Sequence, residues 1–185
     1  MQTLETNRLI LRPWRESDLT DFHEYCTDPE VGPNAGWKPH ESMEESRQIL
    51  SIFLKDESES AVVLKETGKV IGSFGLYCDR LGHKALGSGR EIGYVLSHDY
   101  WGHGLIPEAV RRVIRFAFDE VGLDYLSISH FPFNGRSKRV IEKCRFRYEK
   151  TAQATYRNYR GEMLAEVCYL LTRQDYLENR EFYQS

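Results

Sequence analysis

Two glycines stand directly before the strongest helical pattern in the sequence. They belong to the segment Trp101-Gly102-His103-Gly104-Leu105-Ile106, which is followed by Pro107. Glycine lets the main chain turn tightly and approach a ligand closely, and the first amides of a helix attract an anion with the help of the helix dipole. A turn of this kind can hold a pyrophosphate. It can also be a plain connection from a strand to a helix, because a GxG sequence alone is weak support for a ligand.

A second polar segment follows one predicted strand later and strengthens the first. It begins Asn134-Gly135-Arg136-Ser137 and continues with Lys-Arg-Val-Ile-Glu-Lys-Cys-Arg-Phe to residue 146. Two other phosphate-binding patterns are absent from the sequence, which has no GxxxxGK(S/T) motif and no GxGxxG after the first predicted strand. The sequence therefore predicts neither a P-loop nucleotide site nor a dinucleotide-binding fold.

Length and composition predict one domain without a polyanionic partner. The 185 residues include 41% hydrophobic and 29% charged side chains, so the chain can bury a core, and we expect a single domain over residues 1–185. The net charge of -3, from 25 Lys plus Arg against 28 Asp plus Glu, gives no general attraction to nucleic acid. Small basic clusters could still recognise one phosphate group, as at Arg111-Arg112 with Arg115 and at Arg136 with Lys138-Arg139.

The cysteines and the hydropathy pattern indicate where the protein works. Cys26, Cys78, Cys144 and Cys168 are far apart and form no CxxC pair or Cys/His cluster, so we expect free, buried thiols and no metal site. The first residues are polar, and no stretch approaches the ~20 apolar residues that span a bilayer. We therefore expect a protein of the reducing cytoplasm with no membrane partner.

Apolar periodicity and capping residues predict the elements that must position these segments. Strands are expected over residues 4–12, 61–65, 70–78, 91–97, 125–131, 146–150 and 167–172. Helices are expected from a cap at Ser17 or Asp18 to residue 26, from a cap at Ser42 to residue 54, and over 107–121 and 136–143, with an irregular loop over 28–36. The order β-αα-βββ-α-β-α-ββ implies an α/β (α+β) fold with a mixed sheet and helices on its faces.

Three segments in this order resemble the GNAT superfamily of acetyltransferases, especially its ribosomal-protein-alanine acetyltransferase-like branch. They are residues 4–12, the segment from Asp99 to Ala109, and Asn134 with Ser137 through Phe146, and the resemblance covers nearly the full length. It implies a mixed, mostly antiparallel central sheet of about six to seven strands, flanked by about four helices and splayed at the coenzyme site. It also implies acetyl-coenzyme A (acetyl-CoA) as cosubstrate.

The resemblance assigns the coenzyme contacts residue by residue. It implies that the Val95 and Leu96 amides pair with the pantetheine arm, and that Asn134 and Ser137 lie beside the arm near its sulfur. The pyrophosphate would be held in the turn that Trp101 opens, by the amides of Gly102, His103, Gly104, Leu105 and Ile106.

Three residues depart from the family pattern. Trp101 stands where Gln or Arg is usual, Ile106 where a small residue is common, and Arg145 where Gly usually precedes the Phe. Main-chain amides can bind a phosphate whatever side chain they carry. Of these three residues, only Arg145 therefore affects the backbone geometry, at the turn before Phe146.

The implied reaction needs a neutral amine, a donor for the oxyanion and a proton for the departing thiolate. The resemblance implies direct attack in a ternary complex, without an acyl-enzyme. The Val95 or Leu96 amide is the candidate oxyanion donor, a group that can supply on the order of 2.7–4 kcal/mol. Ile141 stands where some relatives place a Tyr acid. In the closer branch the Ser three residues after the Asn lies near the sulfur, so the resemblance makes Ser137 the candidate that donates or relays the proton. The alternative for Ser137 is a hydroxyl that caps the helix after it.

Two residues are candidates for the base that accepts the amine proton. Glu91 begins the strand that is expected to splay, His130 ends the strand opposite, and either could act directly or through water. Glu91 could instead pair with Arg90 or another surface base, and His130 could be a structural histidine. We expect the His103 ring to face solvent and Cys144 to serve in packing.

The sequence thus predicts an enzyme that moves an acetyl group from acetyl-CoA to a primary amine. The sequence leaves two kinds of acceptor open, a protein or peptide amino terminus and a small-molecule amine. It also leaves open whether the protein is a monomer or a homodimer. Residues 156–162 resemble a hairpin tip that could contact the acceptor or a second subunit. A non-catalytic acyl-CoA sensor or assembly module is the alternative, and a plain α/β interaction domain is a third hypothesis.

Overall fold

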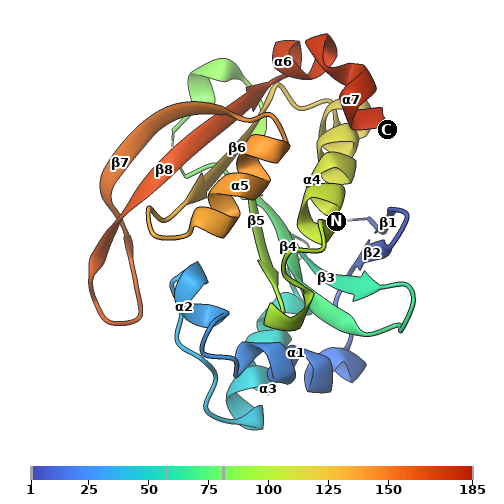
Figure 1. Ribbon diagram of the computed structural model, residues 1–185, viewed down its shortest axis with the longest axis vertical. Coiled ribbons are helices and arrows are strands. Elements are labelled where there is room, and N and C mark those ends of the chain that lie inside the picture. The colour runs from blue at the N-terminus through green and yellow to red at the C-terminus, as the bar shows by residue number, and fades with distance from the viewer. Residues whose placement is uncertain (1, 57, 81, 185) are drawn as a thin grey trace. The chain divides into compact units, whose positions relative to one another are not determined.

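The computed structural model describes residues 2–56, 58–80 and 82–184 (Figure 1). The described residues fall into two compact units: unit 1 lies within residues 1–75, 94–105 and 158–161, and unit 2 within residues 76–93, 106–157 and 162–185. Three elements have residues in both units, namely the strands β4 (Val70–Cys78) and β5 (Gly89–Leu96) and the helix α4 (Leu105–Arg115).

The sheet is mixed and mostly antiparallel, as the sequence predicts. Its other strands are β1 (Leu4–Glu5), β2 (Leu9–Arg12), β3 (Glu59–Leu64), β6 (Tyr125–His130), β7 (Arg147–Arg157) and β8 (Met163–Thr172). The order is β1-β2-β3-β4-β5-β6-β8-β7, which makes eight strands where about six to seven are expected. Among the pairs with a described register, β5–β6 is parallel and the others are antiparallel.

The extra strand arises because residues 4–12 form a hairpin and not one strand. Leu4 in β1 pairs with Leu11 in β2. Thr6 closes the turn: its N–H donates to the Leu9 carbonyl (2.9 Å), and its hydroxyl oxygen accepts from the Leu9 N–H (2.9 Å). A threonine hydroxyl can compete for backbone groups in this way, which breaks the run of strand residues.

The helices in the described residues also outnumber the expectation of about four. With α4 they are seven: α1 (Leu19–Cys26), α2 (Gly32–Ala35), α3 (Met43–Phe53), α5 (Gly135–Lys143), α6 (Arg173–Glu178) and α7 (Arg180–Gln184). The expectation of an irregular loop over 28–36 is wrong, because α2 begins at Gly32 with Pro33 in its first turn, and Gly36, at φ 91°, ends it. Proline and glycine mark helix ends as well as loops.

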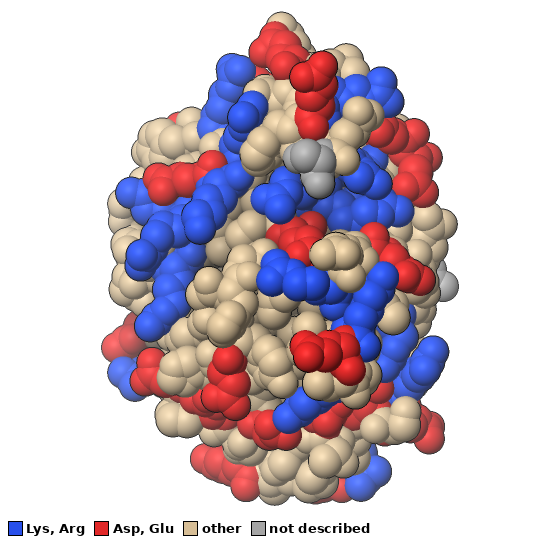
Figure 2. All heavy atoms as spheres, turned by 45° about the vertical axis from the view of Figure 1, so that its right-hand side comes forward, with Lys and Arg blue, Asp and Glu red and all other residues tan. Residues whose placement is uncertain are grey.

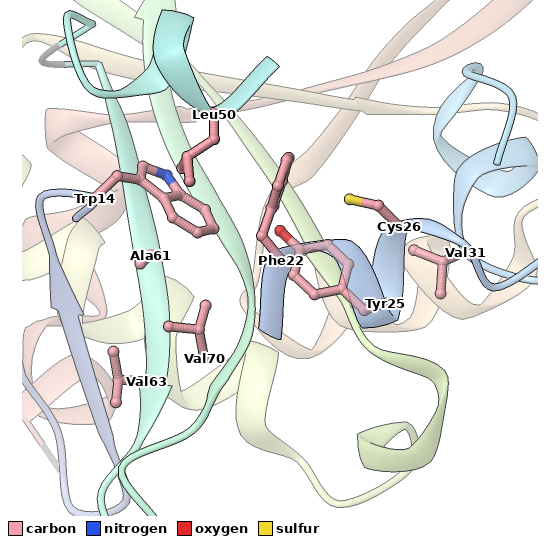
Figure 3. Packing of buried hydrophobic residues seen from close by; sticks show 9 residues of the cluster. All are labelled: Trp14, Phe22, Tyr25, Cys26, Val31, Leu50, Ala61, Val63 and Val70. Atoms are coloured by element: carbon pink, nitrogen blue, oxygen red, sulfur yellow. The ribbon is translucent and has the colours of Figure 1, made fainter. Parts of the chain in front are cut away.

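The core of unit 1 lies where α1 and α3 pack on β3 and β4 (Figure 3). The Trp14 and Phe22 rings meet edge to face, with centroids 5.2 Å apart. Ser42 caps α3 as expected, its hydroxyl oxygen accepting from the Glu45 N–H. The buried members of this core are Trp14, Phe22, Tyr25, Cys26, Val31, Leu50, Ala61, Val63 and Val70.

In unit 2, β7 and β8 form a long hairpin (Figure 1). Both are longer than expected. The pairing runs from Arg147↔Leu170 to Arg157↔Met163, with an irregularity between Ala152 and Tyr156. Most of β7 is exposed, so an apolar pattern could not reveal it, and β8 supplies its backbone partners. Residues 158–162 form the hairpin tip that the sequence indicates.

The helix expected over 107–121 is present as α4 and a π-helical segment, Phe116–Val121. Gly122 ends it in a left-handed conformation (φ 81°). The face predicted to be apolar is buried within unit 2, and its members are Val110, Val113, Ile114, Ala117 and Phe118. Burial of this face holds α4 in place within unit 2.

Arg145 takes the conformation that glycine usually provides at this turn. Its φ is 61°, in the left-handed region. Its guanidinium lies 4.0 Å from the centroid of the Phe182 ring in α7 and donates a hydrogen bond to Asn179. The turn therefore keeps its shape without glycine, and the carboxy-terminal helices hold the larger side chain.

Substitutions at Arg145 should separate backbone strain from side-chain contact. Arg145→Ala loses the contacts and keeps the strain, so we expect the free energy of unfolding to fall by about 0.5–1 kcal/mol. Arg145→Gly loses the same contacts but relieves the strain, and should be about 1–2 kcal/mol more stable than Arg145→Ala. Urea unfolding of the three proteins measures this. Equal stability of the two variants would contradict a strained turn.

Candidate active site

The shape of the turn between β5 and α4 is fixed by contacts within unit 1. Gly102 and Gly104 have φ angles of 84° and 75°, which favour glycine. The Trp101 indole Nε1 donates to the Leu96 carbonyl (2.8 Å), and Arg8 Nη1 donates to the His103 carbonyl (3.0 Å). The Trp101 side chain therefore closes the turn.

The main-chain amides of this turn are available to a ligand. Among the described residues, none accepts a hydrogen bond from the N–H of Gly102, His103 or Gly104. A Cβ atom added at Gly102 would meet nothing within 4 Å. The His103 side chain is exposed, as expected, whereas those of Leu105 and Ile106 are buried. An anion here would meet backbone N–H groups and the start of α4.

The end of β5 lies tightly against β4 within unit 1. A Cβ atom on Gly72 would stand 2.2 Å from the Val95 carbonyl oxygen, and the Ser97 N–H donates to the Ile71 carbonyl (2.7 Å). Successive residues of a strand direct their polar groups to alternate edges. Val95 and Ser97 therefore face β4, and the Leu96 N–H faces away from it. This geometry favours Leu96 over Val95 as the amide that meets a coenzyme.

The ladder between β5 and β6 is short. It ends at Ile92↔Ile128, although β5 continues to Leu96 and β6 to His130. Within unit 2, the pairing therefore stops before the strands do. Strand N–H and C=O groups beyond such a ladder can bond an extended ligand such as a pantetheine arm.

Asn134 and Ser137 meet at the start of α5. Asn134 is the N-cap, and its Oδ1 accepts from the Ser137 main-chain N–H (3.0 Å). The alternative in which the Ser137 hydroxyl caps this helix is wrong, because the cap is the Asn134 side chain. Ser137 is half-buried in the first turn.

Exposed cations follow along α5 in unit 2. They are Arg136, Lys138, Arg139 and Lys143. Figure 2 shows one face of the molecule, on which Lys and Arg gather in bands between Asp and Glu. Cations of this kind can contact an individual phosphate group.

Glu91 is buried in β5 and paired with a cation. Arg80 Nη2 donates to Glu91 Oε1 (2.8 Å) and Arg80 Nε to Glu91 Oε2 (3.1 Å). The pairing that the sequence left open is thus made with Arg80. Arg90 instead donates to the Gly89 carbonyl (2.9 Å).

Glu166 in β8 is a second buried carboxylate beside Arg80. It accepts from Thr155 Oγ1 (2.7 Å), Ser129 Oγ (2.9 Å) and Arg80 Nη2 (3.1 Å). Burial raises the pKa of Glu166, but the Thr155 and Ser129 hydrogen bonds and the Arg80 charge outweigh it, so the pKa lies below its usual range. These contacts stabilise the fold at neutral pH, and their contribution is lost as pH falls through the lowered pKa.

Sequence reasoning missed both Arg80 and Glu166. Glu166 could have been noticed as a charge inside the apolar run Leu164-Ala165-Glu166-Val167-Cys168. Arg80 gives no such signal, because it stands in a polar connection and its partners are distant in the sequence.

His130 has a partner at each ring nitrogen. Nδ1 lies 2.8 Å from the Phe131 carbonyl oxygen, which can only accept, so Nδ1 carries a proton. Nε2 lies 3.3 Å from the Tyr169 hydroxyl. His130 would have to exchange this partner to act as a base, so the geometry favours the structural alternative.

The cysteines are free, as expected, and three are buried, whereas Cys78 is exposed. Burial raises the pKa of Cys144 to about 12, and its Sγ contacts the Pro107 carbonyl. Cys144 therefore serves packing, as predicted. In the described part of the chain, no three or more His, Cys, Asp or Glu side chains gather where they could hold a metal ion. None of the helices within residues 2–56, 58–80 and 82–184 has the length and hydropathy of a membrane span.

Known proteins resemble this chain in sequence and in fold. The family model of the acetyltransferase (GNAT) domain matches residues 8–147. The uncharacterized N-acetyltransferase p20 of Bacillus licheniformis is 28% identical over 182 residues, which cover 95% of this chain and 99% of that protein.

Two solved structures share the fold at lower sequence identity. The ribosomal-protein-S5-alanine acetyltransferase from Vibrio fischeri has a TM-score of 0.72 and 21% identity, over 95% of this chain and 98% of that one. The microcin C7 self-immunity acetyltransferase MccE, in complex with acetyl-CoA and AMP, has a TM-score of 0.76 and 16% identity, over 90% and 93%. The family match spans the glycine turn, Glu91 and the start of α5, and the protein thus belongs to the GNAT family of acetyltransferases.

Proposed function

We propose that the protein is a single-domain N-acetyltransferase that moves the acetyl group of acetyl-CoA to a primary amine. Its family transfers acetyl groups from acetyl-CoA. The observation that carries the proposal is the turn before α4, where two left-handed glycines leave the N–H groups of residues 102–104 without an acceptor among the described residues. Such groups suit pyrophosphate oxygens. We place the enzyme in the cytoplasm, where its free thiols stay reduced.

The coenzyme contacts are proposed residue by residue. The amides of residues 102–106 hold the pyrophosphate, the Leu96 N–H meets the acetyl end, and Asn134 and Ser137 contact the arm near its sulfur. Trp101 acts by closing the turn through its bond to the Leu96 carbonyl.

The proposed reaction is direct attack. The amine nitrogen forms a bond to the thioester carbonyl carbon, and the carbonyl oxygen becomes an oxyanion that the Leu96 N–H stabilises, a contact worth on the order of 2.7–4 kcal/mol. The amine proton passes to a base. The intermediate then collapses, the C–S bond breaks, and the thiolate takes a proton donated or relayed by Ser137.

Glu91 is the better candidate for the base. Its carboxylate has about four acceptor positions, and Arg80 is the only described side chain that donates to it. The carboxylate therefore keeps acceptor capacity for a water molecule that relays the amine proton. His130 already uses both ring nitrogens.

The acceptor is the finer part of the proposal. We propose a protein or peptide amino terminus, as in the ribosomal-protein-alanine acetyltransferase-like branch, with a small-molecule amine as the other possibility. Mass spectrometry of a mixture of peptides and metabolites, incubated with the enzyme and acetyl-CoA, tests activity and acceptor together. Acetylated products and acceptor-dependent thiol release support the proposal, and a lack of acetyl-CoA binding overturns it.

A non-catalytic acyl-CoA sensor is the second candidate. Ile141, where some relatives have the Tyr acid, is fully buried, and Glu91 is neutralised by Arg80. The sensor hypothesis predicts tight coenzyme binding without turnover on any amine.

Filling the turn should weaken coenzyme binding. Gly102→Trp places a side chain in the open space at the turn, so we expect the Kd for acetyl-CoA to rise at least about tenfold, or ~1.4 kcal/mol. Gly68→Trp is a matched control, because Gly68 has a similar φ (72°) and is equally open. Calorimetric titration measures both. Equal affinities in the two variants would reject the amide account.

Ser137→Ala should lower kcat by about tenfold or more while the Kd for acetyl-CoA is unchanged, since proton donors contribute ~10²–10⁴. Ser137→Thr keeps the hydroxyl and should retain turnover. The Asn134 cap uses the main-chain N–H, so both variants should keep α5. Full activity of Ser137→Ala would remove Ser137 from the chemistry.

Glu91→Gln should lower kcat/KM by about 10²-fold and remove the acidic limb of its pH profile, because the amide cannot accept the proton. His130→Gln keeps a donor and an acceptor and should retain that limb. Steady-state rates between pH 5 and pH 10 measure the difference. The opposite pattern would assign the base to His130.

A further inference from the structure

Arg80 lies between two buried carboxylates in unit 2. It follows β4 in the chain and contacts Glu91 on β5 and Glu166 on β8. The two carboxylate side chains are 6% and 4% exposed, whereas the Arg80 side chain is 49% exposed. One partly solvated cation therefore serves two carboxylates that are almost removed from water.

The contact between Arg80 and Glu91 has two points. Arg80 Nη2 and Nε donate to different oxygens of the carboxylate, and the Arg80 main-chain N–H approaches Oε2 at 3.4 Å. A planar guanidinium that bonds both oxygens fixes the rotation of a carboxylate, which a lysine ammonium cannot do in the same way.

Arg80 is itself held in place through Glu166. Thr155 on β7 and Ser129 on β6 donate to Glu166, which accepts from the same Nη2 that reaches Glu91. Three strands thus determine where the guanidinium lies. Arg80 transmits that position to Glu91.

A second charged cluster adjoins this one through Asp79. His83 lies between Asp79 (2.9 Å) and Glu149 on β7 (2.7 Å). The Asp79 carboxylate also accepts from Ser127 Oγ (2.9 Å) and the Tyr125 hydroxyl (3.1 Å). The described charged groups around Glu91 therefore include Arg80, which contacts it, and Glu166, which shares Arg80 Nη2 with it. Asp79, His83 and Glu149 form the adjoining cluster, and Arg90 precedes Glu91 in the strand.

We propose that Arg80 is a positioning residue, which sets the orientation of the Glu91 carboxylate for proton transfer from the acceptor amine. The inference rests on the proposed function and on Glu91 as the base. The fork fixes the rotation of the carboxylate and leaves acceptor positions on it for the proton or its relaying water. A misplacement of about 1 Å in such a group can cost 10²-fold in rate.

Two substitutions separate orientation from charge. Arg80→Met removes both, so kcat should fall about tenfold or more, while the KM for acetyl-CoA should not change. Arg80→Lys keeps the charge without the fork, so kcat should still fall and the KM for acetyl-CoA should again stay at its wild-type value. Arg90→Gln is the matched control, because the Arg90 guanidinium donates a hydrogen bond only to the Gly89 carbonyl among the described residues; its kcat and KM should equal those of the wild type.

Unchanged kcat in Arg80→Met would overturn the proposal, and full activity in Arg80→Lys would show that charge alone suffices. A second readout does not depend on turnover: the carbon-13 NMR signal of the Glu91 carboxyl, assigned with Glu91→Gln, should change its chemical shift in Arg80→Met, because both hydrogen bonds of the fork are lost. An unchanged signal would overturn the role of Arg80 even if the enzyme is active. A wild-type protein that acetylates no amine but shows the NMR shift would overturn the proposed function and leave the contact intact.

Discussion

The structure depends on a constraint at the start of α4, where main-chain N–H groups have no carbonyl to meet. A helix leaves its first amides without partners in the helix, and here the preceding turn adds further N–H groups without an acceptor among the described residues. The left-handed glycines make this turn possible, and Trp101 and Arg8 hold it through carbonyls, which keeps the amides available.

This arrangement explains how much of the site the sequence predicts. The glycines, the apolar period of α4 and the Asn134 cap are local signals, and each is present in the structure. The sequence does not reveal the strand break at Thr6 or the helix α2. A threonine can either continue a strand or turn it, and a proline can either break a helix or begin one. Arg80 and Glu166 were missed because their contacts join residues 80, 91 and 166, and no local pattern encodes such a meeting. Strand alternation in β5 favours Leu96 over Val95 only because the structure shows that Val95 faces β4.

The two halves of the proposed chemistry rely on different parts of the chain. The proposed donor binding uses main-chain groups, which Trp101 and Ile106 also supply in place of the usual family residues. Proton transfer uses side chains whose positions depend on long-range packing, as with Glu91 and its guanidinium partner. This difference explains why the family membership and the donor follow readily from the sequence, whereas the acceptor belongs to a proposal.

The most direct test of the amide account is a titration of nitrogen-15-labelled protein with acetyl-CoA, followed by the backbone amide signals in NMR. The account predicts large shifts for residues 102–106 and for Leu96, with little change at Gly68 in the β3–β4 turn. Coenzyme binding that leaves the signals of residues 102–106 in place would contradict it.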